Sequence, residues 1–158
     1  MVLAALILIL STAFLFFYLQ ATCQRILRQQ FDQEYFQAIV NGSRLEFPAV
    51  RQTLGELNAP VDYPRLRMML KRDFLALTYL LKNAVNVKQR YSGKERLLMF
   101  YFRFVFASLI TLHWLRVAEK PGILKLTAIL QYFANVVGQR VDTVRFANLT
   151  AADYLLGL

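Results

Sequence analysis

The sequence has little of the material from which catalytic sites are made. Its 158 residues include one cysteine, Cys23, one histidine, His113, and only ten acidic residues, which are scattered along the chain. A single cysteine excludes an internal disulfide framework, and scattered carboxylates do not predict the di-metal site of some helical bundles. No zinc-protease, CxxC, phosphate-loop or dinucleotide-binding pattern occurs. We therefore expect that the protein is not an enzyme and holds no metal.

The first 24 residues carry no charge at all, and this absence is the most informative one. Val2–Leu19 is apolar except for one Ser-Thr pair. About 20 such residues are enough for a helix to cross a hydrocarbon core of roughly 30 Å. Arg25 and Arg28 follow the run, and basic residues mark the cytoplasmic flank of a span. Residues 1–24 are therefore predicted to be a retained transmembrane anchor, with the N-terminus outside and the rest of the chain in the cytoplasm.

A cleaved signal peptide and a lipoprotein signal are the alternatives for this run. A signal peptide opens with a positively charged region and ends at small residues. Here no basic residue precedes the run, and Leu19–Cys23 is a poor cleavage site. Gln20 and Thr22 also fit a lipoprotein signal poorly. Cys23 at the cytoplasmic end of the anchor would suit reversible acylation, although an ordinary small residue there is the simpler interpretation.

The remaining residues, 25–158, leave room for one helical bundle domain. The helical spacing of apolar residues continues beyond the anchor, so that one helix is predicted from about Val2 to Val40. Asn41-Gly42 would end it, because glycine adopts the left-handed conformation of a helix C-terminus. A short helix is expected near Ala49–Leu57. A longer one is expected over Pro64–Val87, with Asp62 as its cap.

A basic patch is expected on the side of the Pro64–Val87 helix that lies opposite its apolar stripe. It comprises Arg65, Arg67, Lys71 and Arg72, with Lys82 and Lys88 further on and only Asp73 to relieve the charge. Together with Arg25 and Arg28, these are the candidate residues for binding anionic lipid headgroups or an acidic partner. A merely solvated face is the alternative. Nucleic acid is the other partner of basic surfaces, but the anchor favours lipid, so none is expected.

Ser92 and Glu95 form a capping box, and the segment that follows, 97–115, is apolar all round. Such a helix is buried in a core or in a bilayer. We favour the central helix of the bundle; the alternative, a second span, is opposed by Arg103. His113 is the one residue that could ligate a haem iron or a chlorophyll-type magnesium. A histidine with a satisfied hydrogen bond is commoner, so no cofactor is expected.

The last part of the chain is predicted to contain one main helix and a short tail. Pro121-Gly122 should break the chain. A helix over Ile123–Val137 follows, with polar residues along one stripe. Thr150–Asp153 has the spacing of a capping box and should begin a short apolar turn. Such a turn would pack back on the bundle or dock on a partner.

These features together predict an all-α protein. An N-terminal transmembrane helix continues into a long helix, which packs with about three further helices. Hydrophobic residues make up 57% of the chain, which is more than one anchor explains. We expect a non-catalytic accessory or structural subunit of a larger membrane complex, with other integral membrane proteins as partners. The alternatives are a free-standing scaffold that binds anionic lipids and, on His113 alone, an accessory pigment- or haem-binding protein.

Overall fold

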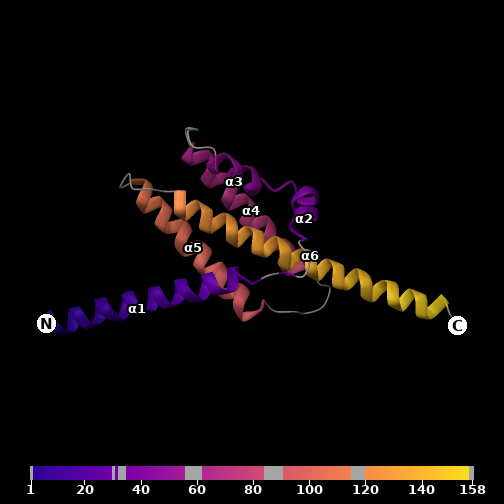
Figure 1. Cartoon of the computed structure of the whole chain (residues 1–158), viewed down its shortest axis with the longest axis horizontal. Coiled ribbons are helices and arrows are strands. Elements are labelled where there is room, and N and C mark those ends of the chain that lie inside the picture. Colours follow the sequence, from indigo (N-terminus) through magenta and orange to yellow (C-terminus); the bar gives the residue numbers. More distant parts are fainter. Residues whose placement is uncertain are drawn as a thin grey trace.

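The structure, a computed structural model, describes residues 2–29, 31, 35–55, 62–83, 91–114 and 120–156; side chains are described for these except 112 and 143–156. The described chain is helical apart from short connections, which confirms the all-α prediction. The helices are α1 (Val2–Leu27), α2 (Phe36–Ser43), α3 (Phe47–Gly55), α4 (Tyr63–Asn83), α5 (Gly93–Trp114) and α6 (Lys120–Leu156) (Figure 1). The long apolar helix α1 packs against a bundle formed by the others.

The centre of the bundle is α6, because each of the other five helices contacts it. Its first half is buried on most sides. The fully or nearly fully buried residues there are Ile123, Leu126, Thr127, Ile129, Leu130, Phe133, Ala134 and Val137. The prediction that residues 97–115 form the central helix was therefore wrong. Burial on all sides needs neighbours on all sides, and only α6 has them.

Helix α5, which covers that predicted segment, is buried along one side only. It begins as expected, because the Ser92 N–H donates to Glu95 Oε2 at 3.0 Å, one half of the predicted capping box. Its buried residues recur three to four apart: Leu98, Tyr101, Phe102, Val105 and Leu109. The opposite side, with Phe100 and Trp114, is exposed. Among the described helices only α1 is long and apolar enough to cross a membrane, so the alternative of a second span over 97–115 gains no support.

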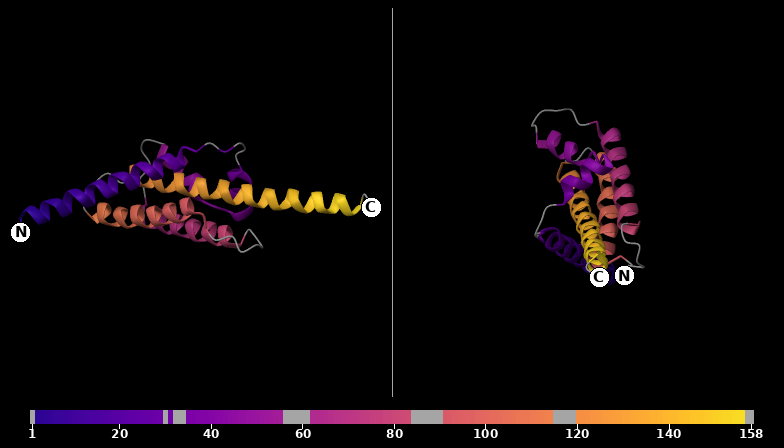
Figure 2. Two further views of the ribbon diagram at one scale, coloured as in Figure 1. Left: turned by 90° about the horizontal axis from the view of Figure 1, so that it is seen from below. Right: turned by 90° about the vertical axis from the view of Figure 1, so that its right-hand side faces the viewer.

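The C-terminal part of the chain is one continuous helix rather than a helix and a separate tail. Pro121 and Gly122 lie in the first turn of α6 and do not break it. Proline is tolerated there because the N–H that it lacks has no partner inside the helix. No further proline follows, and the helix runs to Leu156. Its C-terminal half extends beyond the bundle, away from the N-terminus (Figure 2). How the predicted tail packs lies outside the described side chains.

The predicted helix from Val2 to Val40 is in fact two helices. α1 ends at Leu27, and α2 begins at Phe36, whose N–H donates to Asn135 Oδ1 of α6 at 2.9 Å. This break lets α2 lie on α6, which covers the apolar stripe that a straight helix would leave in water. Asn41-Gly42 lies inside α2; the left-handed residue is Arg44, whose N–H bonds to Val40 O.

Gly138 allows the chain before α2 to approach α6 closely. A Cβ at Gly138 would collide with the Cβ of Tyr35. The Tyr35 hydroxyl also donates to Asp142 Oδ2 of α6 at 3.0 Å. Glycine in a helix interior costs about 1 kcal/mol relative to alanine, and here it is required by the contact. None of this can be inferred from helical periodicity, since α2 and α6 lie far apart in the sequence.

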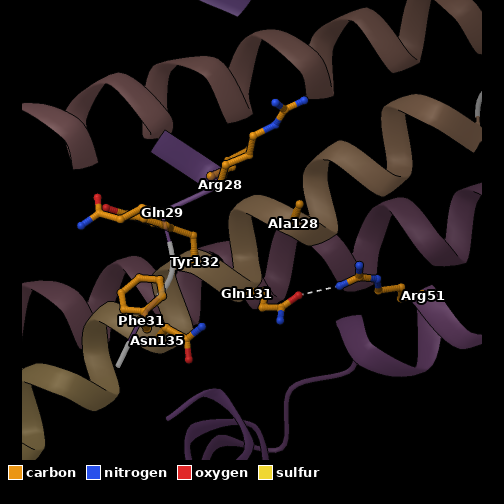
Figure 3. A pocket seen from close by; sticks show the side chains of 9 residues that line it. Arg28, Gln29, Phe31, Arg51, Ala128, Gln131, Tyr132 and Asn135 are labelled. Carbon is orange, nitrogen blue, oxygen red and sulfur yellow. Dashed lines mark hydrogen bonds between the residues drawn. The ribbon is translucent and has the colours of Figure 1, made fainter. Parts of the chain in front are cut away.

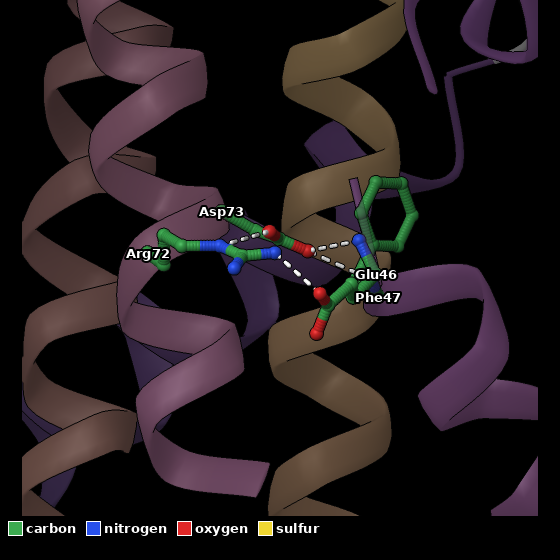
Figure 4. Close-up of polar contacts among 4 residues, drawn as sticks. All are labelled: Glu46, Phe47, Arg72 and Asp73. Carbon is green, nitrogen blue, oxygen red and sulfur yellow. Dashed lines mark hydrogen bonds and ion pairs between the residues drawn. The ribbon is translucent and has the colours of Figure 1, made fainter. Parts of the chain in front are cut away.

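The carboxylate of Asp73 on α4 holds the start of α3 (Figure 4). Asp73 Oδ2 accepts the backbone N–H groups of Glu46 and Phe47, at 2.8 and 2.7 Å. Arg72 Nη2 completes the group by bonding to Glu46 Oε1 at 2.6 Å. Asp73 is only 1% exposed, so its predicted place on the exposed basic side of α4 was wrong. The short helix expected near Ala49–Leu57 is present as α3, but it begins at Phe47, where Asp73 caps it. Its predicted end at residue 57 lies outside the described residues.

The predicted cap of α4 is also present. The Arg65 N–H lies 3.4 Å from Asp62 Oδ1, a long hydrogen bond that marks the helix start at Tyr63. The helix is described as far as Asn83, so its predicted end at Val87 lies outside the described residues. The apolar stripe expected on this helix comprises Leu66, Met69, Leu70, Phe74, Leu77, Leu81 and Ala84. Five of these residues are buried, Met69 is half-buried, and residue 84 lies outside the described residues. Periodicity thus predicted most of the buried stripe, but not the burial of Asp73.

A largely buried ion pair ties the start of α5 to α6, and the same arginine ties the end of α4 to α6. Arg140 Nη2 lies 2.5 Å from Glu95 Oε1, and Arg140 Nη1 donates to Leu81 O of α4 at 3.3 Å. Glu95 is thus shared between the start of its own helix and α6. Removal of one member of a buried pair leaves the other charge without compensation. The pair therefore fixes the register of α5 along α6.

We expect Asp73→Ala to destabilise the fold far more than Asp73→Asn does. Alanine leaves two N–H groups at the start of α3 without an acceptor, which should cost about 2–4 kcal/mol. Asparagine keeps an oxygen acceptor and should cost about 1 kcal/mol or less. The free energy of unfolding of the detergent-solubilised protein measures both. Equal losses in the two variants would contradict the capping role.

The same carboxylate should make stability depend on pH. Burial raises the pKa of Asp73 above its ordinary value, although the bonds from Glu46 and Phe47 act against the rise. The folded chain then binds this proton more tightly than the unfolded chain. The tighter binding of this proton stabilises the folded chain. This stabilisation is fully present below the ordinary carboxyl pKa and is lost as pH rises through the raised pKa of Asp73. We expect the free energy of unfolding of the wild type to increase, relative to Asp73→Asn, as pH is lowered through this window. The opposite slope would contradict a raised pKa.

Candidate binding surfaces

The side of α4 that points away from the bundle carries large apolar side chains ringed by basic ones. Met68, Leu75 and Tyr79 are 72%, 57% and 68% exposed. Residues at this spacing share one side of a helix. Four exposed basic residues flank them: Arg65, Lys71, Arg72 and Lys82. We call these seven residues the outer face of α4.

The structure places the four basic residues predicted on α4 at its surface, but they differ in what they contact. Arg72 is held by Glu46 and lies beside Asp73. The Arg67 guanidinium lies 5.5 Å from the centroid of the Phe106 ring of α5, a cation–π contact. Arg65 and Lys71 are exposed and reach outward. The sequence prediction found these charges and missed the apolar residues between them, although the spacing of Met68, Leu75 and Tyr79 was a usable signal.

A polar pocket of about 490 Å³ lies where the end of α1 meets α3 and α6 (Figure 3). Arg28 and Arg51 line it from two sides, together with the amide side chains of Gln29, Gln131 and Asn135. Arg51 Nη1 donates to Gln131 Oε1 at 2.5 Å, while Arg28 extends away from this pair. Guanidinium and amide donors suit a carboxylate or phosphate group. The sequence prediction named Arg28 but not Arg51 or Gln131, which only the fold brings close to it.

The two basic residues predicted to follow the anchor are exposed at the end of α1. Arg25 lies in the last turn of that helix, and Arg28 comes just after it. A positive charge at a helix C-terminus interacts favourably with the helix dipole. The side chains from Val2 to Tyr18 are exposed, whereas Leu19, Ile26 and Leu27 pack against the bundle core. The basic flank therefore lies where α1 joins the bundle.

His113 is exposed near the end of α5 and does not line either cavity described here. Its ring stacks on that of Tyr63 at the start of α4, with centroids 3.9 Å apart and an angle of 7° between the planes. Two large aromatic residues of the same helix, Phe100 and Trp114, are exposed and enclose no site beside it. No group of three potential metal ligands occurs among the described residues. The described surroundings of His113 thus provide no enclosed site for a haem or a chlorin.

Cys23 is fully buried, on the side of α1 that faces the bundle core. The predicted acylation site therefore has no access to an acyl donor while α1 is packed in this way. The side chain acts as a small apolar residue at the junction of α1 and α5, helices that contact each other directly. This supports the simpler of the two interpretations of Cys23.

The burial of Cys23 can be tested by thiol labelling, because it is the only cysteine in the chain. We expect a water-soluble maleimide to react slowly with the folded protein in detergent and rapidly after denaturation. A matched control is Gln24→Cys in a Cys23→Ser background, since Gln24 is the next residue along α1 and its side chain is exposed. The control should react rapidly in the folded state. Equal rates for the two folded proteins would show that α1 does not pack on the bundle as described.

Comparison of the chain with protein-family models, with curated proteins and with solved structures found no match. No relative therefore suggests a ligand, a partner or a reaction. The function has to be inferred from the anchor helix and from the surfaces described above. Of these surfaces, the outer face of α4 has the most distinctive chemistry.

Proposed function

We propose that the protein is a membrane-anchored, non-catalytic subunit that binds another integral membrane protein through the outer face of α4. The observation that carries this proposal is the exposure of Met68, Leu75 and Tyr79 along one line of a well-packed helix. Large apolar side chains grouped on a surface mark binding sites. Their spacing suits a partner helix whose own apolar side fits between them.

The flanking charges define the partner further. Arg65, Lys71 and Lys82 border the apolar line on a protein of net charge +9. A partner helix with acidic residues on either side of an apolar stripe would complement them. Such pairs at the edge of an interface govern specificity and the rate of association more than they govern affinity. The partner is therefore expected to be an acidic, amphipathic helix of a neighbouring membrane subunit.

The anchor gives this proposal its cellular setting. α1 is long and apolar enough to span a bilayer, and Arg25 and Arg28 follow its apolar part. By the positive-inside rule, α1 crosses with its N-terminus outside, and the bundle lies on the cytoplasmic side. The competing function is that of a free-standing scaffold, in which the same basic residues bind anionic headgroups. The two functions differ in whether a stoichiometric protein partner exists.

The proposal is tested by extracting the tagged protein from its native membrane in mild detergent and analysing the size-exclusion peak by mass spectrometry. We expect co-elution with one or more integral membrane proteins in fixed ratio. The variant Leu75→Glu with Tyr79→Glu should lose that partner, since buried apolar anchors of this size each contribute about 2 kcal/mol or more.

The matched control is Val141→Glu, which places the same charge at an exposed apolar position on α6. It should retain the partner in the wild-type ratio. A stable, monodisperse monomer or homo-oligomer of the wild type would contradict the subunit proposal and favour the lipid-binding scaffold. Retention of the partner by the α4 variant would show that a different surface binds it.

A further inference from the structure

The part of α1 that stands free of the bundle is too short to cross a membrane alone. Val2–Leu15 rises only about 21 Å at about 1.5 Å per residue, and the hydrocarbon core is roughly 30 Å thick. The next residue, Phe16, stacks on Phe104 of α5, with ring centroids 4.8 Å apart. Further along, Leu19 and Cys23 pack into the bundle core. A tilt of α1 would reduce the height that its free part covers.

A spanning α1 therefore brings α5 down to membrane depth. The end of the bundle on this side is where α4 begins, α5 ends and α6 begins. Figure 1 and the left-hand view of Figure 2 place the end of α5 and the start of α6 toward the same side of the molecule as the N-terminus of α1. The stacking of Tyr63 on His113 places the start of α4 there too.

The residues exposed at this end have the composition of a membrane interface. Trp114 is 86% exposed, and Phe104, Ile110 and Leu124 are exposed as well. Arg65 and Lys120 lie at the first turns of α4 and α6, also exposed. Tryptophan and basic side chains concentrate at the level of lipid headgroups, with apolar side chains deeper.

A crevice of about 370 Å³ between α1, α5 and α6 likewise combines apolar side chains with a basic one. Its lining includes Leu19 of α1 with Tyr101 and Leu109 of α5, and Lys125 of α6 is the one charged residue among its lining. A mainly apolar crevice beside a membrane span fits a lipid acyl chain. A lysine at the same site fits the phosphate of that lipid's headgroup.

We propose that this end of the bundle is seated in the cytoplasmic leaflet beside α1. Phe104 and Ile110 lie among the acyl chains, Trp114 lies where the acyl chains meet the headgroups, and Arg65 and Lys120 contact anionic headgroups. The inference rests on the anchoring role of α1 proposed above. Its distinctive consequence is that the bundle does not stand off the membrane on a stalk. The outer face of α4 then meets its partner close to the bilayer surface.

The protein contains its own probe, since Trp114 is its only tryptophan. The full-length protein is reconstituted into vesicles that contain anionic and zwitterionic lipids, with bromine on the acyl chains of a fraction of them. We expect the brominated lipids to quench Trp114 fluorescence strongly and aqueous acrylamide to quench it weakly. Two control chains carry Trp114→Phe, one with Phe14→Trp in the free part of α1 and one with Val141→Trp on α6. The first should behave like Trp114, and the second should be quenched by acrylamide.

The controls separate the possible failures. If acrylamide quenches Trp114 while the Phe14→Trp probe is quenched by brominated lipid, the anchor stands and the seated bundle end is refuted. If the Phe14→Trp probe is not quenched by lipid either, the anchor itself fails. If neither agent quenches Trp114, protein covers this end, and a second copy or another subunit replaces lipid as its occupant.

The headgroup contacts are tested separately with Arg65→Gln combined with Lys120→Gln. Each basic residue close to an anionic surface changes the preference for the bound state about fivefold. We expect brominated lipids to quench Trp114 more strongly in anionic than in purely zwitterionic vesicles, and this difference to be lost in the double variant. Lys82→Gln, at the far end of α4, should retain it. An equal response in both vesicles would refute the headgroup contacts.

Discussion

The structure depends on one buried carboxylate, that of Asp73. Helix α3 is too short to be stable on its own, because helix formation has a costly nucleus. Asp73 provides the acceptors for the N–H groups of Glu46 and Phe47 at its start, and thereby fixes α3 to α4. Once α3 is placed, Arg51 reaches Gln131 on α6 and one wall of the polar pocket exists. A single side chain thus links the start of a short helix to the arrangement of three others.

Features that depend on residues close in sequence could be predicted. The apolar run of α1, the cap at Asp62 and the bond from the Ser92 N–H to Glu95 each involve a few consecutive residues, and each is present. The buried stripe of α4 follows from its period of 3.6 residues. The all-α class and the surface location of the basic residues on α4 follow from the same local patterns. The use of those residues cannot be inferred in this way, and it remains a proposal.

Features that depend on contacts between distant segments could not be predicted. Asn135 accepts the first N–H of α2 and so permits the break after α1, but its spacing on α6 only indicates a polar stripe. Asp73 follows two basic residues, Lys71 and Arg72, in the sequence. It nevertheless turns toward α3, because a buried N-terminus needs acceptors. The central place of α6 depends on how many helices surround it, which hydrophobicity alone does not determine. Helix α5 is also largely apolar, yet its described side chains are exposed along one side.

Helix α1 and the bundle pack together through a shared core. α1 extends from the predicted anchor, residues 1–24, into the predicted domain, and its last turns carry Cys23, Ile26 and Leu27 into the shared core. A helix that is fixed to a rigid bundle cannot change its depth in a bilayer independently. In the proposed arrangement, in which α1 spans the bilayer, the depth of α1 therefore determines the position of the ends of α4, α5 and α6 relative to the lipid. Arg140 fixes α4 to α6 through Leu81 O at one end, and Asp73 fixes α4 to α3 near its middle. In the proposed membrane-anchored arrangement, the outer face of α4 is therefore held at a fixed height and angle to the membrane. Such a fixed presentation suits recognition of a partner that is itself embedded in the same bilayer.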